Sequence, residues 1–273
     1  MESASLDSLL RPDSVAVVGA SREPGTIGYE VLDNLLEHDY SGTVYPVNPK
    51  ARSVHSVRAY PSVSDLPEVP ELAMIVVPKE YVVDVVRECG EAGVAGVVVI
   101  SAGFREVGEK GARRERELLE IAREHGMRMV GPNCMGVINT SGDFSLNATF
   151  APSMPPAGPI AFMSQSGAMG VSILDYAAEY GFGISQFVSM GNKADVSGND
   201  LLEYWRRDDE VGVILMYLEN FGNPQNFNRI ARATTREKPV VAVKAGRSKA
   251  GARAASSHTG ALAAMDVATD ALF

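Results

Sequence analysis

One of the four histidines, His258, lies in a context that could support chemistry. It ends a long loop of small residues, KAGRSKAGARAASSH, at the point where a helix is predicted to begin. A loop of small residues can pack closely or move, and a histidine at its end can present a ring nitrogen to a ligand. A capping or solvent-exposed histidine explains the same position, so the residue pattern leaves both interpretations open.

A second segment has the composition of an anion-binding turn. Residues 162–170, FMSQSGAMG, run from an apolar stretch through small residues into a predicted helix. Backbone N–H groups at such a turn bind an anion without charged side chains. The residues expected to hold a phosphate there are Ser164, Gln165, Ser166 and Gly167. A serine nucleophile in a G-x-S-x-G elbow is disfavoured, because the first glycine of that motif is absent.

A loop from Gly19 to Gly28, GASREPGTIG, follows the first predicted strand and leads into a helix. Glycines allow a sharp turn and let a phosphate approach the helix N-terminus, where free N–H groups and the helix dipole favour anions. The spacing is not G-x-G-x-x-G, so the loop alone is a weak signal. A strand–helix turn without a ligand remains an alternative.

The residue type that follows the second predicted strand helps to distinguish which ligand the glycine loop would bind. NAD-binding sheets usually place Asp or Glu there to hold the ribose hydroxyls, whereas this sequence has Val47-Asn48-Pro49-Lys50. A lysine suits an additional phosphate, such as the 3′-phosphate of coenzyme A or the extra phosphate of NADP. A solvated loop lysine is the third interpretation.

The elements that must position these residues alternate along the chain. Short runs rich in valine and isoleucine are separated by amphipathic stretches, which indicates doubly wound α/β architecture with parallel sheets. Predicted strands cover 14–18, 43–47, 72–77, 94–100 and 127–130, then 159–163, 184–189, 211–218 and 239–244. Predicted helices cover 26–38, 79–92 and 109–125, then 167–180, 200–207, 225–235 and 260–273.

Two domains follow from this pattern. We expect a first α/β domain at 1–140 and a second at 151–273, joined by an aperiodic linker in 139–159. The chain stops at Phe273 within a predicted helix and without a capping glycine, so we expect the second domain to be truncated there. Parallel sheets bind ligands beyond the carboxyl ends of their strands, which places Val77-Pro78 and Ser101-Ala102 beside the glycine loop.

The composition restricts the classes of function. The formal net charge of −9 gives no support to nucleic-acid binding. Cys89 and Cys134 lack CxxC spacing, so we expect no disulfide scaffold, no cysteine zinc site and a reducing, cytoplasmic setting. The N-terminus lacks the pattern of a secretory signal, and no stretch approaches 18 apolar residues, so we expect no membrane span.

Five segments of the first domain resemble a known family in the order in which they occur. VAVVGASREPGTIG, YPVNPK, IVVPKE, VISAGF and GPNCMG are similar to the coenzyme A-binding domain of ADP-forming acetyl-CoA synthetases and to the α subunit of succinyl-CoA synthetase. In the second domain, SQSGAMG and SSHTGAL resemble the phosphate-binding helix end and the phosphohistidine segment of NDP-forming acyl-CoA synthetases. The resemblance implies a Rossmann-like coenzyme A-binding domain followed by a flavodoxin-like domain.

The resemblance also implies roles for individual residues. His258 would be the phosphorylated histidine, and Glu219, in MYLENF, would be the glutamate that stabilises it. The residues implied along the coenzyme A path are Ser21, Arg22, Gly25, Thr26, Lys50, Val77, Pro78, Ser101 and Ala102.

The implied reaction converts acyl-CoA, phosphate and ADP or GDP into a carboxylate, coenzyme A and ATP or GTP, through an acyl phosphate and phospho-His258. Nothing in the sequence resembles an ATP-grasp nucleotide domain, so nucleotide and Mg²⁺ would bind a partner domain or subunit, and we expect an oligomer. Two rival functions remain. One is a coenzyme A-binding regulatory module of a protein lysine acetyltransferase, which His258 disfavours. The other is an NAD(P)-dependent oxidoreductase, which the missing acidic residue disfavours.

Overall fold

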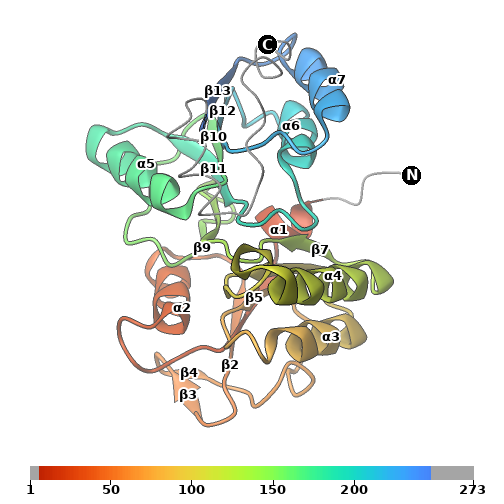
Figure 1. The fold of residues 1–273 in the computed structure, drawn as a ribbon. Helices are drawn as coiled ribbons and strands as arrows, with labels where there is room; N and C mark the ends of the chain where they lie inside the picture. The colour runs from red at the N-terminus through yellow and green to blue at the C-terminus, as the bar shows by residue number, and fades with distance from the viewer. Residues whose placement is uncertain (1–5, 247–273) are drawn as a thin grey trace.

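The first sheet contains five parallel strands in the order β2-β1-β5-β6-β7 (Figure 1). The structure is a computed structural model, and it describes residues 6–246. The strands are β1 (Ser14–Val18), β2 (Thr43–Val47), β5 (Leu72–Ile75), β6 (Gly96–Val99) and β7 (Arg128–Val130). Every residue of β1, β5 and β6 is buried, as expected for a parallel sheet that is covered on both faces.

Alternate strand residues point to opposite faces of this sheet, and the residues on both faces are buried and largely apolar. Helices therefore cover both faces. Val15 and Val17 of β1 belong to the core cluster that contains residues of α2 (Ile27–Glu37). Ala16 and Val18 belong to the cluster that contains residues of α3 (Val82–Ala92) and α4 (Glu109–Glu124). The short elements of this domain are α1 (Asp7–Leu10), the hairpin strands β3 (Ser53–Val54) and β4 (Val57–Arg58), and the 3-10 helix η1 (Arg105–Val107).

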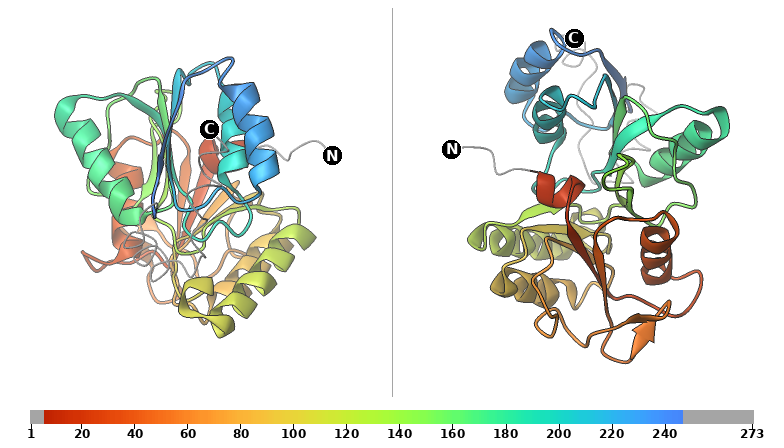
Figure 2. Two further views of the ribbon diagram at one scale, coloured as in Figure 1. Left: turned by 45° about the horizontal axis from the view of Figure 1, so that its top comes forward. Right: turned by 180° about the vertical axis from the view of Figure 1, so that it is seen from behind.

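The second sheet contains six strands in the order β13-β12-β10-β11-β8-β9. Its strands are β8 (Gly136–Asn139), β9 (Leu146–Thr149), β10 (Ile160–Ser164), β11 (Ile184–Ser189), β12 (Val213–Leu218) and β13 (Val240–Lys244). The helix α5 (Gly167–Tyr180) packs on one face, while α6 (Gly198–Arg206) and α7 (Pro224–Thr234) pack on the other (Figure 2). The expected succession of two α/β sheets is confirmed.

The predicted linker at 139–159 differs from the structure. It contains β9, whose four residues are all buried, and β9 pairs antiparallel with β8. In turn, β8 pairs antiparallel with β11, so both strands extend the second sheet. Asn34 of α2 donates hydrogen bonds to the carbonyl oxygens of Thr149 and Ala151, at 2.8 and 2.9 Å, which fastens this edge to the first domain. Sheet membership thus changes at Gly136, while the boundaries 1–140 and 151–273 stay predictions.

Two expectations lie outside the described residues: the helix predicted at 260–273 and the position of His258. Within residues 6–246, no helix combines the length and apolar composition needed to cross a bilayer.

Candidate functional site

The glycine loop after β1 is built by close backbone contacts. Gly19 has a φ of 100°, and its N–H donates a hydrogen bond to the carbonyl oxygen of Val47, at the end of β2, at 3.0 Å. Helix α2 approaches so closely that a Cβ atom on Gly28 would lie 2.1 Å from the carbonyl oxygen of Gly19. Only glycine therefore permits this approach, which places the N-terminus of α2 directly beside the loop.

The loops after β2, β5 and β6 lie along the same edge. The Asn48 side chain donates a hydrogen bond to the carbonyl oxygen of Ala20 at 2.7 Å, and the backbone N–H of Lys50 donates to Asn48 Oδ1 at 2.8 Å. The Ser101 hydroxyl donates to the carbonyl oxygen of Val77 at 2.5 Å. The chain runs from β1 to β2 on one side and later to β5 on the other, so this edge contains the switch point at which open α/β sheets bind ligands.

All nine residues expected along the coenzyme A path are brought to this edge. Arg22, Gly25, Lys50, Pro78 and Ala102 are exposed, whereas Ser21, Thr26, Val77 and Ser101 are half-buried. Thr26 precedes the first residue of α2, but its hydroxyl donates to the carbonyl oxygen of Glu23 at 2.7 Å instead of capping the helix. Their contacts with coenzyme A stay predictions.

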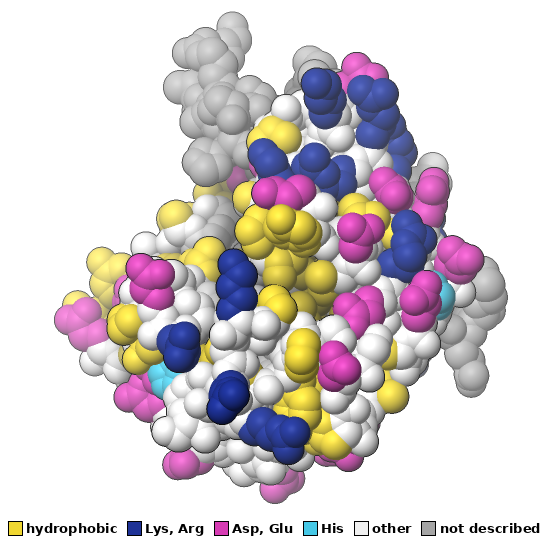
Figure 3. Space-filling view, turned by 90° about the horizontal axis from the view of Figure 1, so that it is seen from below, with side chains coloured by type: hydrophobic (Ala, Val, Ile, Leu, Met, Phe, Trp, Pro, Cys, Tyr) yellow, Lys and Arg dark blue, Asp and Glu magenta, His cyan; other side chains and the backbone are white. Residues whose placement is uncertain are grey.

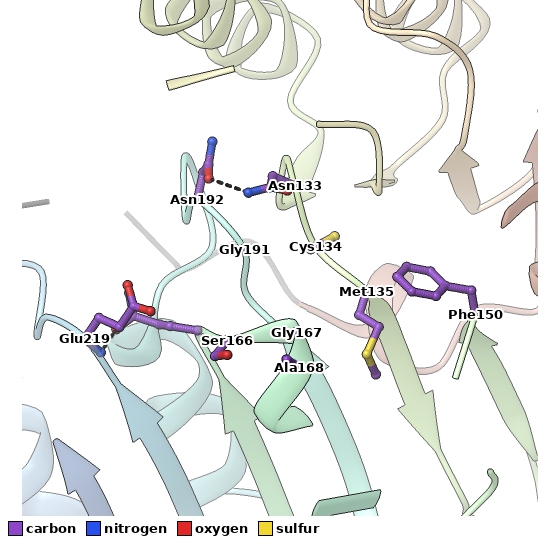
Figure 4. Close-up of a pocket in the computed structure, with 11 residues that line it drawn as sticks. Asn133, Cys134, Met135, Phe150, Ser166, Gly167, Ala168, Gly191, Asn192 and Glu219 are labelled. Atoms are coloured by element: carbon purple, nitrogen blue, oxygen red, sulfur yellow. Dashed lines mark hydrogen bonds between the residues drawn. The ribbon is translucent and has the colours of Figure 1, made fainter. Parts of the chain in front are cut away.

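A cavity of about 270 Å³ lies at the carboxyl edge of the second sheet (Figure 4). Ser166 and Glu219 lie on one side of it, and Asn133 and Asn192 lie across from them. The residues that line it are Asn133, Cys134, Met135, Phe150, Gln165, Ser166, Gly167, Ala168, Gly191, Asn192 and Glu219. Three of the four expected phosphate residues therefore line one cavity together with Glu219.

The turn between β10 and α5 is held by its own side chains. Ser166 is the N-cap of α5, and its hydroxyl accepts a hydrogen bond from the Met169 N–H at 3.4 Å. Ser164 is fully buried, and its hydroxyl donates to the Ser166 carbonyl oxygen at 2.7 Å. The buried Ser164 thus fixes the turn through its hydroxyl. Gly167 and Ala168, in the first turn of the helix, line the cavity.

Glu219 follows β12 and lines the same cavity as this helix end. Its backbone N–H and that of Asn220 both donate to Gln165 Oε1, at 2.6 and 3.0 Å. Its Oε2 atom is buried and accepts no hydrogen bond from the part of the chain that the structure describes. A buried carboxylate oxygen without a donor is costly, so the site has the chemistry to receive an N–H group.

The structure adds residues that the sequence reasoning did not assign, namely Asn133, Asn192 and Lys193. Asn133 lies in the GPNCMG segment and has a φ of 58°. Lys193 Nζ donates to the carbonyl oxygen and to Oδ1 of Asn220, at 3.0 and 2.6 Å. Burial and the nearby Arg105, offset in part by Glu219, lower the pKa of Lys193 to about 8. The available signal was that Asn192 and Lys193 closely follow β11 at the same sheet edge.

Comparisons with known proteins match both domains. Residues 13–140 match the model of a CoA binding domain, and residues 157–273 match that of a succinyl-CoA ligase like flavodoxin domain. The chain is 44% identical over 98% of its length to the α subunit of ADP-forming acetate–CoA ligase I of Pyrococcus furiosus, of which it covers 59%. It is 49% identical over 94% of its length to ADP-forming acetate–CoA ligase I of Archaeoglobus fulgidus, of which it covers 37%.

A solved structure agrees with the fold over nearly the whole chain. It is the dinucleotide-forming acetyl-coenzyme A synthetase 1 of Ca. Korarchaeum cryptofilum in complex with phosphate and ADP, with a TM-score of 0.94 and 42% identity. The match covers 99% of this chain and 58% of that one. The chain therefore spans less than two thirds of the length of these relatives.

A CoA binding domain joined to a succinyl-CoA ligase like flavodoxin domain defines the class of protein to which this fold and site correspond. Over nearly its whole length, the chain is similar to an ADP-forming acetate–CoA ligase and to the α subunit of another. The resemblance found in the sequence is thereby confirmed, and these relatives give no support to an acetyltransferase regulatory module.

Proposed function

We propose that this chain is the coenzyme A-binding and phosphohistidine-bearing part of an NDP-forming acyl-CoA synthetase. Phosphate attacks the acyl carbon of acyl-CoA, which forms an acyl phosphate and releases coenzyme A. His258 then takes the phosphoryl group and releases the carboxylate, and phospho-His258 passes the group to ADP or GDP. The sequence leaves the identity of the acid and of the nucleotide open.

The observation that carries this proposal is the buried Glu219 Oε2 atom at the cavity, which accepts no hydrogen bond from residues 6–246. A histidine nucleophile needs its second ring nitrogen held by an acceptor, which fixes the tautomer and balances the developing positive charge. Glu219 supplies such an acceptor at the same cavity as the α5 N-terminus, where backbone N–H groups favour the phosphate. The two parts that phosphohistidine chemistry requires thus line a single cavity.

The first domain has the features that suit coenzyme A. Figure 3, which views the molecule from the end of the first domain, shows Lys and Arg side chains spread among hydrophobic and acidic ones. Despite the net charge of −9, this end of the molecule therefore exposes basic groups. Arg22 lies in the glycine loop, and Lys50 follows β2 beside it. Both are exposed, so their cationic groups can contact the phosphates of coenzyme A.

The sequence of this chain shows no recognisable motif for the proposed nucleotide step. The sequence contains no G-x-x-x-x-G-K-[ST] loop, and the chain covers 59% of the Pyrococcus furiosus α subunit. We propose that an ATP-grasp domain or subunit binds the nucleotide with Mg²⁺ and that the two assemble as an oligomer. Cys89 and Cys134 are both buried and free, which suits the proposed cytoplasmic setting.

Glu219→Gln tests the proposed site. The variant keeps the shape of the side chain but loses the charge that balances a protonated imidazole, so phosphorylation of the chain by acetyl phosphate slows by about 100-fold. Glu179→Gln, at an exposed position of α5, is the matched control and keeps the wild-type rate. Wild-type phosphorylation kinetics in Glu219→Gln would remove Glu219 from the mechanism.

A further inference from the structure

The carboxylate of Glu106 connects the two domains. Glu106 belongs to η1, just after the Ser101-Ala102 turn, and its Oε1 atom accepts hydrogen bonds from the N–H groups of Gly103 and Phe104. Its Oε2 atom accepts a hydrogen bond from Asn192 Nδ2 at 2.7 Å. One carboxylate therefore holds a loop of the first domain with one oxygen and a cavity residue of the second domain with the other.

Asn192 is oriented by these contacts. Its Nδ2 group also donates to Glu115 Oε2 at 2.8 Å, and its backbone N–H donates to the Pro132 carbonyl oxygen at 2.9 Å. Both amide hydrogens face carboxylates, so the Oδ1 atom points to the other side, where Asn133 Nδ2 lies 3.4 Å away at the cavity. The cavity wall opposite α5 is thus set by carboxylates of the first domain.

The next residue continues the connection toward Glu219. Lys193 binds the carbonyl oxygen and the side chain of Asn220, and the backbone N–H groups of Glu219 and Asn220 bind Gln165. A continuous series of hydrogen bonds and adjacent residues therefore runs from the Gly103–Phe104 backbone to the residue proposed to orient His258.

Glu106 is held in its ionised form, in which its carboxylate can only accept hydrogen bonds. Burial alone would raise the pKa of Glu106, but hydrogen bonds from Asn192 and from the Gly103 and Phe104 backbone lower it below its usual value. The carboxylate of Glu115 would repel that of Glu106, and Arg105 offsets this repulsion with its Nε atom 3.5 Å from Glu115 Oε1. An ionised Glu106 can only accept, which matches its three N–H donors.

We infer that Glu106 is a positioning residue. It holds the loop at residues 101–104, on the proposed coenzyme A path of the first domain, at a fixed position relative to the phosphate cavity of the second domain. The inference rests on the proposed function, in which an acyl group moves between the coenzyme A sulfur and a phosphate in this cavity. Transfer between two bound groups depends on placement to within about 1 Å. A rigid contact between the two binding sites supplies that placement. It also makes the affinity of one site depend on whether the other site is occupied.

Glu106→Gln isolates this role. The amide oxygen of the new side chain still accepts from Gly103 and Phe104, but its NH₂ group faces the NH₂ group of Asn192, so the contact between domains is lost. The dissociation constant of inorganic phosphate is measured by calorimetry on the full chain, with and without saturating coenzyme A. In the wild type we expect coenzyme A to change this constant by about fivefold or more. In Glu106→Gln the ratio of the phosphate dissociation constants with and without coenzyme A falls below about twofold. Each ligand alone still binds within about threefold of its wild-type affinity.

Glu109→Gln is the control, because it removes the same charge from an exposed position three residues away. It keeps the wild-type ratio. A wild-type ratio in Glu106→Gln, or independent binding of the two ligands to the wild type, would overturn the inference and leave the proposed function standing. Failure of coenzyme A to bind the wild type would instead contradict the proposed function, and with it the role of Glu106.

Discussion

The side-chain oxygen of Gln165 accepts a hydrogen bond from the backbone N–H of Glu219 at 2.6 Å, and a second from Asn220 at 3.0 Å. Gln165 is 7% exposed, so solvent cannot readily replace it as the acceptor. Gln165, the first residue after β10, thus holds the backbone of the glutamate that lines the same cavity.

Gln165→Leu leaves both of these N–H groups without an acceptor, so we expect the free energy of unfolding to fall by about 2 kcal/mol. Gln165→Glu keeps an acceptor and most of the stability, but it adds negative charge beside the phosphate site and weakens phosphate binding. Urea denaturation and phosphate calorimetry separate the two effects. Equal stability of the leucine variant and the wild type would show that the backbone of Glu219 does not depend on Gln165.

The contact between Gly28 and Gly19 predicts a steric effect of substitution. A Cβ atom at position 28 would lie 2.1 Å from a backbone oxygen, so Gly28→Ala must displace α2 or the loop. We expect a loss of about 2 kcal/mol in the free energy of unfolding, together with weaker coenzyme A binding. In Gly142→Ala the new Cβ has no atom of residues 6–246 within 4 Å, so stability should change by less than about 0.5 kcal/mol. Similar losses in both variants would contradict the close approach of α2.

Lys193 predicts a dependence of stability on pH. Its pKa is lowered to about 8 in the folded chain, whereas the ordinary value of 10.5 applies when the chain unfolds. Between these values the unfolded chain binds more protons than the folded one, so the free energy of unfolding rises with pH. Below pH 8 both states are protonated, and the cost of the buried charge is present in full.

Lys193→Met removes this titration. Relative to the variant, the wild type should gain up to about 3 kcal/mol between pH 8 and pH 10.5, as measured by urea denaturation at several pH values. A difference between the two proteins that stays constant across this range would show that Lys193 titrates as an ordinary lysine.

Lys50 predicts a difference between two ligands. Its backbone is tied through Asn48 to Ala20 in the glycine loop, which supports a position near a bound phosphate. Lys50→Ala should weaken coenzyme A by about tenfold and dephospho-coenzyme A by less than about twofold, because only the former carries the 3′-phosphate. Lys110→Ala, at an exposed position of α4, is the control and should weaken neither ligand. Equal losses for both ligands in Lys50→Ala would show that Lys50 does not face the 3′-phosphate.

Local pattern was sufficient to predict most elements of the fold. Helix α5 and strand β11 occupy the predicted residues 167–180 and 184–189, because continuous apolar strands and amphipathic helices repeat strongly here. Strands β8 and β9 were missed. They are four residues long, and the fully buried Asn147 lies in β9, so their pairing with distant strands overrides their local composition.

In the candidate site, too, some residues were predictable from local pattern, whereas others depend on how distant parts of the chain pack. Ser166, Gly167 and Glu219 were predictable because they lie at strand ends that motifs had marked. The contact between Glu106 and Asn192 joins residues 86 positions apart and depends on how the domains pack, which no local pattern encodes. The coenzyme A contacts and the role of His258 stay predictions.

The central claim is that His258 carries a phosphate during the reaction. The most direct test is to incubate the chain with acetyl phosphate, or with acetyl-CoA and phosphate, and to map the modified residue by mass spectrometry. We predict an acid-labile, base-stable phosphate on His258 that is absent from His258→Asn, while coenzyme A affinity changes by less than about threefold because the two functions lie in different domains. A phosphoester on a serine, or label that persists in His258→Asn, would contradict the account.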